Sequence, residues 1–407
     1  MQTQREAIVV GAGPAGIASA LSLKDLGVSP LVLERSDRVA SSWRGRYDRL
    51  TLNTNRKYSH LPGRPFPEGT PTFPTRDQVV EHLERHASED GIDMRLGVPV
   101  ERIDRDGDGW LVRTPEGDFS APEVIVATGY ENQPHIPEWE GRDEFRGDVL
   151  HAADYRNPEP YRGREVLVVG PGCTGMEIAY DLVEGGAAKV RLAVRTPPNI
   201  FLRTGPGGVP GDVIAVKLYR APIKFADAFA RLGRKKAVGD LSEYGLPIPE
   251  EGVFSRVRRL GVAPAIIDPE VVEAIRERRI EIVAAVESFD RSGVHLADGS
   301  RLEPDAVICA TGYRRALEPM VGHLGILGRH GAPKIVAPKP AAEGLRFVGY
   351  VPRPAALRYT AKDAKRAAKA IRRELRRGRY RPAAMSSATR AGLNGGDEAR
   401  VPTANSG

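Results

Sequence analysis

A strand, a glycine-rich turn and a helix follow one another at two places in this sequence. The apolar run at 7–10 meets the turn GAGPAG at 11–16, and the run at 165–169 meets GPGCTG at 170–175. In such a turn the first glycine permits a tight bend, the second leaves room for a pyrophosphate, and the third lets the helix approach the strand. The helix N-terminus adds partial positive charge. We therefore predict two dinucleotide-binding units.

The two units differ in the residue that ends their second strand. Glu34 follows the apolar run at 31–33, whereas Arg195 follows the run at 190–194. A carboxylate accepts hydrogen bonds from ribose hydroxyls, and a guanidinium forms charge-assisted bonds to a 2′-phosphate. The second unit is thus predicted to bind NADPH in preference to NADH. Two dinucleotide sites also indicate redox chemistry, with a flavin as the natural acceptor of the hydride.

Further apolar runs indicate a discontinuous first domain. Strands at 123–127 and 305–310 each run into Ala-Thr-Gly-Tyr, which suggests that the chain crosses between domains there. We expect an α/β protein with two Rossmann-like domains, the second inserted in the first. The expected limits are 1–160 plus 305–380 for the first domain, 161–304 for the inserted domain, and 381–407 for a disordered tail.

The remaining periodicity predicts a few more elements. Residues 95–115 indicate a hairpin that turns at the Asp-Gly-Asp-Gly segment 106–109. Helical spacing of apolar residues predicts helices at 216–232 and 269–278. Both helices are expected to belong to the inserted domain.

Composition excludes several classes of protein. Cys173 and Cys309 are the only cysteines of the 407 residues, so a disulfide scaffold, a CxxC redox pair and a cysteine-rich zinc site are excluded. The sequence shows no convincing set of histidine and carboxylate ligands, so we expect no metal site. No run of 18 apolar residues occurs, and no leader precedes the first strand, so we expect a cytoplasmic protein without membrane insertion.

The net charge of +7 comes from one stretch. Residues 359–380 hold nine Lys or Arg against Asp363 and Glu374, with alanines at helical spacing. Such a stretch could bind nucleic acid or an anionic lipid surface, but the pattern favours an amphipathic helix with a solvated charged face. We expect no nucleic-acid partner.

The segment between the two units carries a family resemblance. Phe145, Gly147, His151 and Tyr155 form the string FxGxxxHxxxY, which resembles the fingerprint of class B flavin-containing monooxygenases. Baeyer-Villiger enzymes have Trp at the last position. Matches extend from the first turn to Ile371, and the layout is most similar to that of YUCCA-type monooxygenases. The resemblance implies a glutathione-reductase-like flavoprotein with FAD in the first unit and NADPH in the second.

The resemblance also implies roles for individual residues. Asn53 aligns with an active-site asparagine of many flavin-containing monooxygenases, whereas YUCCA-type chains usually have His there. Asn55 is the alternative, and Asn53 could instead merely cap a turn. His151 is expected to couple domain geometry rather than to act as an acid or base. The residues expected to bind the cofactors are Gly11, Gly13, Pro14, Ala15, Gly16, Glu34, Arg35, Trp43, Val100, Thr128, Gly129, Gly170, Gly172, Thr174, Gly175, Arg195, Thr311 and Gly312.

The implied reaction has three variants. In the first, NADPH reduces FAD, the reduced flavin forms a C4a-(hydro)peroxyflavin with O2, and one oxygen atom passes to nitrogen or sulfur of a small organic molecule. In the second, the oxygen goes to a carbonyl carbon, by Baeyer-Villiger insertion or by oxidative decarboxylation of a 2-oxo acid. In the third, the protein is a flavoprotein reductase or oxidase. The substrate and O2 are the expected partners, and a homodimer stays open.

Overall fold

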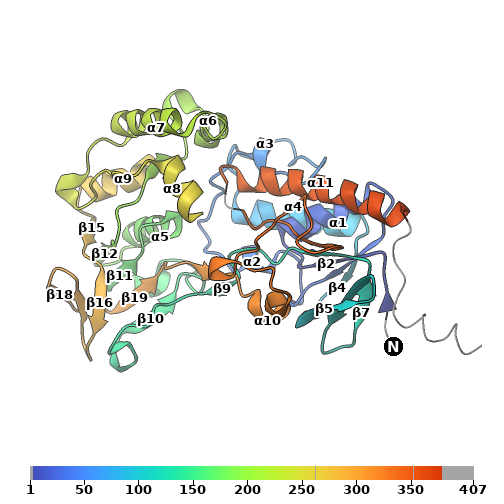
Figure 1. Cartoon of the computed structure of the whole chain (residues 1–407). Coiled ribbons are helices and arrows are strands. Elements are labelled where there is room, and N and C mark those ends of the chain that lie inside the picture. Colours follow the sequence, from blue (N-terminus) through green and yellow to red (C-terminus); the bar gives the residue numbers. More distant parts are fainter. Residues whose placement is uncertain (1–2, 262, 352, 378–407) are drawn as a thin grey trace, which may run out of the picture.

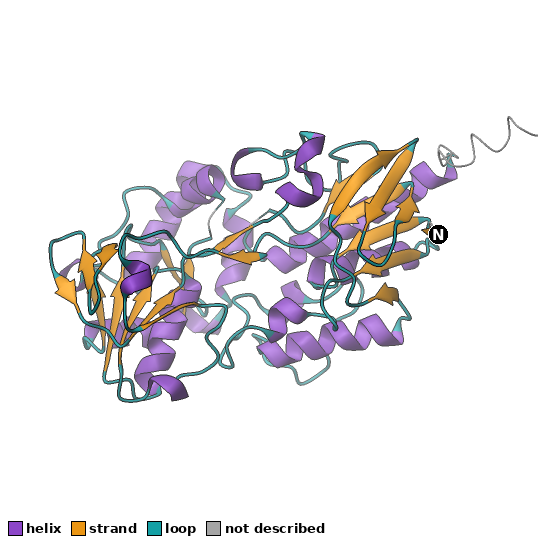
Figure 2. Ribbon diagram, turned by 90° about the horizontal axis from the view of Figure 1, so that it is seen from below, coloured by secondary structure: helices purple, strands orange, loops and turns teal. Residues whose placement is uncertain are grey.

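Two five-stranded parallel sheets lie at opposite ends of the molecule. The structure is a computed structural model that describes residues 3–261, 263–351 and 353–377. Figure 1 follows the chain from the first sheet into the second and back to a long final helix on the first. Figure 2 shows the two sheets well separated, with a short two-stranded connection between them.

The first sheet contains the strand of the first glycine turn. Its strand order is β21-β8-β2-β3-β4, and all its pairings are parallel. Every residue of β2, β3 and β8 is buried, which explains why these strands appear in the sequence as continuous apolar runs. The strands are β2 (Ala7–Val10), β3 (Pro30–Leu33), β4 (Asp93–Arg95), β8 (Glu123–Val126) and β21 (Leu345–Phe347).

Both faces of this sheet are covered. Successive side chains of a strand point to opposite faces. Ala7 and Val9 pack among residues of two helices, whereas Ile8 and Val10 pack against a three-stranded antiparallel layer. The helices are α1 (Pro14–Lys24) and α11 (Ala356–Arg376), and the antiparallel strands are β5 (Arg102–Asp106), β6 (Gly109–Arg113) and β7 (Phe119–Ala121).

The second sheet repeats this order of layers. Its strand order is β10-β19-β11-β12-β15, again all parallel. Val166 and Val168 pack on the side of two helices, and Leu167 and Val169 on the side of an antiparallel layer. The elements are β10 (Asp148–His151), β11 (Glu165–Val169), β12 (Lys189–Ala193), β15 (Ile280–Val283), β19 (Ala306–Cys309), α5 (Cys173–Glu184), α9 (Pro269–Arg276), β16 (Val286–Phe289), β17 (Val294–Leu296) and β18 (Arg301–Leu302).

The other elements connect or flank these two units. Three helices that follow β12 form a small apolar cluster of their own, and two of them lie at the top of Figure 1, above α9. These are α6 (Gly211–Leu218), α7 (Ile223–Ala237) and α8 (Val253–Leu260). The rest are β1 (Thr3–Gln4), α2 (Ser41–Arg44), α3 (Arg56–Ser59), α4 (Arg76–Glu89), β9 (Gln133–Pro134), β13 (Ile200–Leu202), β14 (Ala265–Ile267), β20 (Tyr313–Arg314) and α10 (Glu318–Val321).

The structure confirms the α/β class, the hairpin of β5 and β6, the helix near 269–278 and, for the described part of the stretch 359–380, the helix α11. The single helix expected at 216–232 is wrong, because α6 ends at Leu218 and α7 begins at Ile223. Pro222 stands immediately before α7; it has no N–H to continue a preceding helix.

The expected domain limits are wrong for two strands. The limits at 160 and 305 assign β10 and β19 to the first domain, but both strands pair within the second sheet. The run at 306–309 is buried between β10 and β11, because parallel pairing joins strands that are far apart in sequence. The tail expected at 381–407 lies outside the described residues. Among the helices that are described, none is both long and apolar enough to span a membrane.

Candidate functional site

The first glycine turn is held by backbone contacts that only glycine allows. Gly11 has φ of +104°, and its N–H donates to the carbonyl of Leu33 over 2.8 Å. A Cβ at Gly16 would lie 1.8 Å from the carbonyl oxygen of Gly11. A Cβ at Gly13 would meet no protein atom within 4 Å. The first and third glycines are therefore required by the fold, whereas the second faces open space before the helix.

The second turn has the same geometry. Gly170 has φ of +112°, and its N–H donates to the carbonyl of Ala193 over 3.1 Å. A Cβ at Gly175 would lie 1.9 Å from the Gly170 oxygen, and a Cβ at Gly172 would meet nothing within 4 Å. Both turns thus leave a cradle at the helix N-terminus that a side chain would fill. A pyrophosphate fits such a cradle, since free backbone N–H groups point into it.

Glu34 lies at the first turn, as the sequence predicts. Its side chain is only 8% exposed, and the two carboxylate oxygens accept the N–H of Ala12 at 2.6 Å and of Ser36 at 3.0 Å. The carboxylate is therefore fixed against the backbone of the glycine turn. Arg35 points outward and donates to the side chain of Asn132 over 3.2 Å.

Several other predicted residues gather around the same edge of the first sheet. Thr128 follows β8 and shares a hydrogen bond of 2.7 Å with the Tyr350 hydroxyl, and Gly129 has φ of +79°. Trp43 lies on α2, which begins next to Ala40, whose N–H donates to the turn residue Ala12. The predicted residues Pro14, Ala15 and Val100 lie in the first turn of α1 and in the segment before β5, where Val100 is half-buried against the sheet.

The residues predicted for the second cofactor meet at the equivalent edge of the second sheet. Thr174 lies in the first turn of α5, and Arg195 follows β12. Arg195 is exposed, and no ion pair or hydrogen bond holds its guanidinium within the described part of the chain. Thr311 and Gly312 follow β19; the Thr311 hydroxyl donates to the carbonyl of His135.

His151 connects two crossing segments of the chain. It is 2% exposed, its Nε2 lies 2.9 Å from the Gly312 oxygen, and its Nδ1 accepts the N–H of Ala153 at 3.0 Å. These bonds require the neutral tautomer with the proton on Nε2, and burial lowers the pKa of the ring accordingly. The ring also meets Tyr313 edge-on at 4.9 Å. This arrangement supports the expected positioning role.

Asn53, predicted to be catalytic, lies where the two units meet. Its Oδ1 accepts a hydrogen bond of 3.3 Å from Nε of Arg203, which follows β13 of the second unit. This bond orients the amide, because the oxygen faces the guanidinium and the NH2 group faces away from it. Among the described residues, the only hydrogen bond of the Asn53 side chain is this one to Arg203.

Arg203 is a residue that sequence reasoning missed. It is 7% exposed, and its guanidinium contacts Thr51, the Glu177 carboxylate and, at 3.0 Å, the Asp268 carboxylate. The other oxygen of Glu177 accepts the hydroxyl of Tyr47. Burial raises the pKa of Glu177, and the adjacent guanidinium opposes that rise. One sequence signal was Glu177, an acidic residue within the glycine-turn helix α5.

The alternative residue, Asn55, has a structural role. Its backbone N–H and its NH2 group both donate to Asp212 of α6, at 2.8–3.0 Å, and its Oδ1 accepts the N–H of Lys57. Asn55 and Asp212 are each 5% exposed. All polar atoms of the Asn55 side chain are therefore used to start α3 and to attach it to the second unit.

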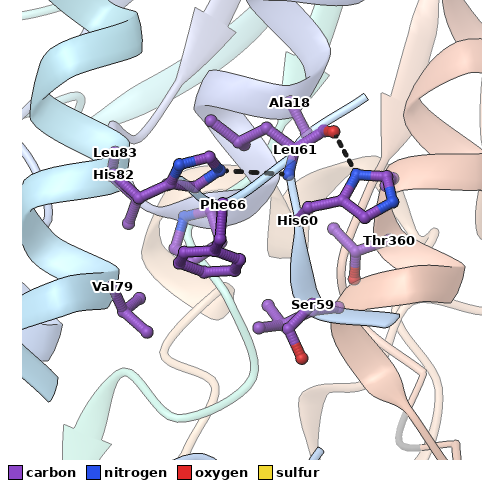
Figure 3. A pocket seen from close by; sticks show the side chains of 12 residues that line it. Ala18, Ser59, His60, Leu61, Phe66, Val79, His82, Leu83 and Thr360 are labelled. Atoms are coloured by element: carbon purple, nitrogen blue, oxygen red, sulfur yellow. Dashed lines mark hydrogen bonds between the residues drawn. The ribbon is translucent and has the colours of Figure 1, made fainter. Parts of the chain in front are cut away.

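A small pocket lies beside the first turn, between α1, α3, α4 and α11 (Figure 3). Pro14 and Ala18 line it on one side, and His82 and Phe66 on another, with the two rings stacked at 4.2 Å. Burial lowers the pKa of His82 to about 3, and its Nε2 accepts the N–H of Leu61. The imidazole is thus neutral and contributes no acid or base to this pocket.

Burial disfavours the thiolate form of both cysteines. Cys173 lies at the start of α5 and donates to the carbonyl of Pro264, and Cys309 is fully buried in β19. Burial raises the pKa of Cys173 to about 11 and that of Cys309 to about 12. A thiol that stays protonated near neutral pH is neither a good nucleophile nor a redox partner.

Comparison with known proteins agrees with this geometry. Residues 8–201 match the family model described as pyridine nucleotide-disulphide oxidoreductase. Indole-3-pyruvate monooxygenase YUCCA1 of Oryza sativa is 35% identical over 90% of this chain and 91% of its own. The probable indole-3-pyruvate monooxygenase YUCCA9 of Arabidopsis thaliana is 36% identical over 80% of this chain and 79% of its own.

Solved structures show the same fold at lower identity. A flavin-containing monooxygenase from Stenotrophomonas maltophilia superposes with a TM-score of 0.70 at 21% identity, covering 92% of this chain and 100% of its own. A bacillithiol disulfide reductase from Bacillus cereus gives 0.63 at 19% identity, covering 91% and 99%. The similarity to YUCCA1 extends over nine-tenths of both chains, and this protein therefore belongs to the family of flavin-containing monooxygenases that includes the YUCCA enzymes.

Proposed function

We propose that the protein is an FAD- and NADPH-dependent monooxygenase that transfers one oxygen atom of O2 to nitrogen or sulfur of a small organic molecule. The observation that carries the proposal is the pair of glycine turns whose second glycine, Gly13 or Gly172, faces open space. A solved structure with a TM-score of 0.71 and 17% identity, OTEMO, is a complex with FAD and NADP. The two units are proposed to be Rossmann-like domains.

The residues present fit both cofactors. We assign the FAD pyrophosphate to the first cradle, where Glu34 keeps carboxylate lone pairs for ribose hydroxyls. We assign NADPH to the second cradle, where the exposed guanidinium of Arg195 is available to a 2′-phosphate. When bound, FAD would supply two kinds of chemistry, which are acceptance of the hydride of NADPH and reaction with O2. The chain's own residues provide binding, orientation and exclusion of water.

Asn53 is proposed to donate a hydrogen bond at the meeting point of the two units. Arg203 fixes the amide oxygen, so the NH2 group is the part that is free to reach a cofactor or substrate oxygen. His151 is proposed to hold the segment at Gly312 in place without exchanging a proton, because both of its ring nitrogens are used. A cytoplasmic location and a homodimer stay predictions from the sequence.

A second candidate reaction is oxidative decarboxylation of a 2-oxo acid. The observation that favours it is the set of relatives named indole-3-pyruvate monooxygenases, which are 33–36% identical. A third candidate, a reductase or oxidase, shares the fold of the bacillithiol disulfide reductase. The raised pKa values of Cys173 and Cys309 argue against disulfide reduction by this chain.

The experiment combines isotope labelling with measurement of peroxide. Purified protein is assayed for bound flavin and NADPH oxidation under 18O2, with a tertiary amine, a thioether, a cyclic ketone and an aryl 2-oxo acid. We expect one 18O atom in an N-oxide or S-oxide. Loss of CO2 from the 2-oxo acid would select the second candidate instead. Hydrogen peroxide equal to the NADPH consumed, with every substrate, would overturn oxygenation, and absence of bound flavin would overturn the cofactor assignment.

A further inference from the structure

Helix α7 exposes large apolar side chains to solvent. Phe225, Phe229 and Leu232 are 61%, 49% and 54% exposed, the three highest values among large apolar residues in the described chain. The other exposed residues of this kind, such as Leu96 and Ile335, have lower exposure. Isolated exposed apolar residues are ordinary, but a contiguous group of them marks an interaction surface.

The three residues form a stripe along one side of the helix. Positions separated by four and then three residues lie above one another on an α-helix. The two phenyl rings are 6.4 Å apart and nearly parallel, which shows that they point the same way. The opposite side of α7 is also apolar, because Ala226 and Ala230 pack against α8. Helix α7 therefore has one apolar face for the fold and a second that the fold does not use.

The exposed charged residues of α7 itself are all basic. Lys224, Arg231, Lys235 and Lys236 are exposed on α7. The only acid of the helix is Asp227, whose carboxylate accepts the N–H groups of Phe254 and Ser255 and so turns toward α8. The exposed surface of α7 thus combines a Phe-Phe-Leu stripe with four positive charges and no exposed acid.

A second basic helix lies along the same side of the molecule. In Figure 1, α7 and α11 both lie along the upper side, α7 over the second unit and α11 over the first. Exposed cations of α11 include Lys365, Arg366, Lys369 and Arg373. The buried side of α11, with Ala364 and Ala368, packs on the first unit, so its charges face outward.

We propose that α7 docks this protein peripherally on an anionic lipid bilayer, with the Phe225–Phe229–Leu232 stripe inserted at the headgroup boundary. Aromatic and aliphatic side chains flanked by lysines are the composition of helices that lie in the membrane interface. Basic residues near an anionic surface add attraction that falls off within a Debye length. A second copy of the chain is disfavoured as the occupant, because pairing two such faces would bring eight cations together.

The test measures binding to vesicles by flotation, using the full-length protein with its flavin. Vesicles contain phosphatidylcholine alone or phosphatidylcholine with phosphatidylglycerol. We expect binding to the mixed vesicles at low salt, at least about tenfold tighter than to phosphatidylcholine alone, and weakened at high ionic strength. Absence of binding to the mixed vesicles at low salt would overturn the proposal.

Two matched variants distinguish binding through the stripe from nonspecific hydrophobic binding. Phe225→Ser combined with Phe229→Ser removes the two aromatic rings. Leu96→Ser combined with Ile335→Ser removes two other exposed apolar residues, which are 41% and 42% exposed and lie in the first unit. We expect the first variant to lose about 90% of binding and the second to bind like the parent, since each buried ring adds affinity. Flavin content and thermal unfolding confirm that both variants fold.

Two results contradict the assignment to lipid. Equal binding of the aromatic variant and its control would show that α7 is not the docking element. A mass that doubles with protein concentration, and returns to that of a monomer in the aromatic variant, would identify a second copy as the occupant. Lys235→Gln with Lys236→Gln completes the test, because we expect it to lower binding and its salt dependence without affecting NADPH oxidation.

Discussion

The two glycine turns share one backbone geometry, but the residues at their second strand ends are used differently. Glu34 is almost buried and already bound to the backbone of its own turn. Arg195 is exposed, and its guanidinium has no partner among the described residues. The first site is thus built into the fold, whereas the second keeps its charge in solvent. This difference fits the proposed assignment, in which FAD stays bound in the first unit during catalysis and NADPH enters and leaves the second.

The largest expected effect comes from the third glycine of each turn. Gly16→Ala and Gly175→Ala would force a Cβ to within 2 Å of a carbonyl oxygen, so each should cost about 1–3 kcal/mol of unfolding free energy, or more. We expect Gly16→Ala to lose flavin and folded yield, and Gly175→Ala to keep the flavin but lose NADPH oxidation. Urea unfolding and the flavin absorbance check both. Loss of flavin in both variants would contradict the division of labour.

Substitution of the second glycine of each turn tests cofactor binding while leaving the stability of the fold unchanged. The methyl group added by Gly13→Ala or Gly172→Ala has no protein atom within 4 Å. The unfolding free energy of the flavin-free protein should therefore change by less than about 0.5 kcal/mol. Each added methyl would occupy the cradle, and we expect about a tenfold loss of affinity, which is 1.4 kcal/mol. In titrations, only Gly13→Ala should weaken the affinity for FAD. Only Gly172→Ala should raise the KM for NADPH. An unchanged affinity in either variant would place the pyrophosphate elsewhere.

Removing the positive charge at position 195 tests the preference for NADPH over NADH. Arg195→Gln removes the guanidinium, and we expect the preference for NADPH over NADH to fall by about 10- to 100-fold, because hydrogen bonds to charged groups contribute about 1.5–3 kcal/mol. The ratio of kcat/KM for the two nucleotides measures it. Lys189→Gln, at the opposite end of the same strand, is the control and should leave the ratio unchanged. An unaltered ratio in Arg195→Gln would remove this residue from the site.

The smallest effect is expected at the thiol of the second turn. With the pKa of Cys173 raised to about 11 from 9.0, its thiolate fraction at pH 8 should be about 100-fold below that of an ordinary cysteine. Alkylation should therefore be slow and should accelerate about tenfold for each pH unit up to pH 11. A serine hydroxyl at this position can still donate to the carbonyl of Pro264 and accept the N–H of Ile266, as the thiol does, so Cys173→Ser should retain NADPH oxidation within about twofold. Inactivation by mild alkylation at neutral pH would revive a thiol-based reductase.

The glycine turns could be predicted from local sequence patterns. Contacts between residues far apart in the sequence could not. The turns were predictable because the requirement for glycine arises within six residues, as at Gly170 and Gly175. The contacts of Arg203 were not, because Thr51, Glu177 and Asp268 come from three separate segments. The domain limits failed for the same reason, since β19 completes a sheet that begins at β10. Sequence pattern carries side-chain periodicity but not the order of strands in a parallel sheet.

The site predictions divide in the same way. Glu34 and Arg195 lie at the strand ends where the pattern placed them. The orientation of the Asn53 amide depends on a hydrogen bond from Arg203, which is 150 positions away in the sequence. No local pattern encodes such a contact. The outward stripe of α7 was hidden as well, because apolar periodicity alone does not tell a helix's buried face from an exposed one.

The placement of β21 and α11 has a consequence for synthesis on the ribosome. The strands of the second sheet are all translated once residue 309 has emerged. The first sheet, although its glycine turn is translated first, still waits for β21 and for α11. The fully buried Arg346 of β21 then joins Glu123 of β8 to Glu374 of α11. Because domains fold as units during translation, the unit that begins first is completed last. The nascent chain therefore carries an incomplete apolar sheet through most of its synthesis, and premature termination before α11 removes one of the two helices that cover one of its faces.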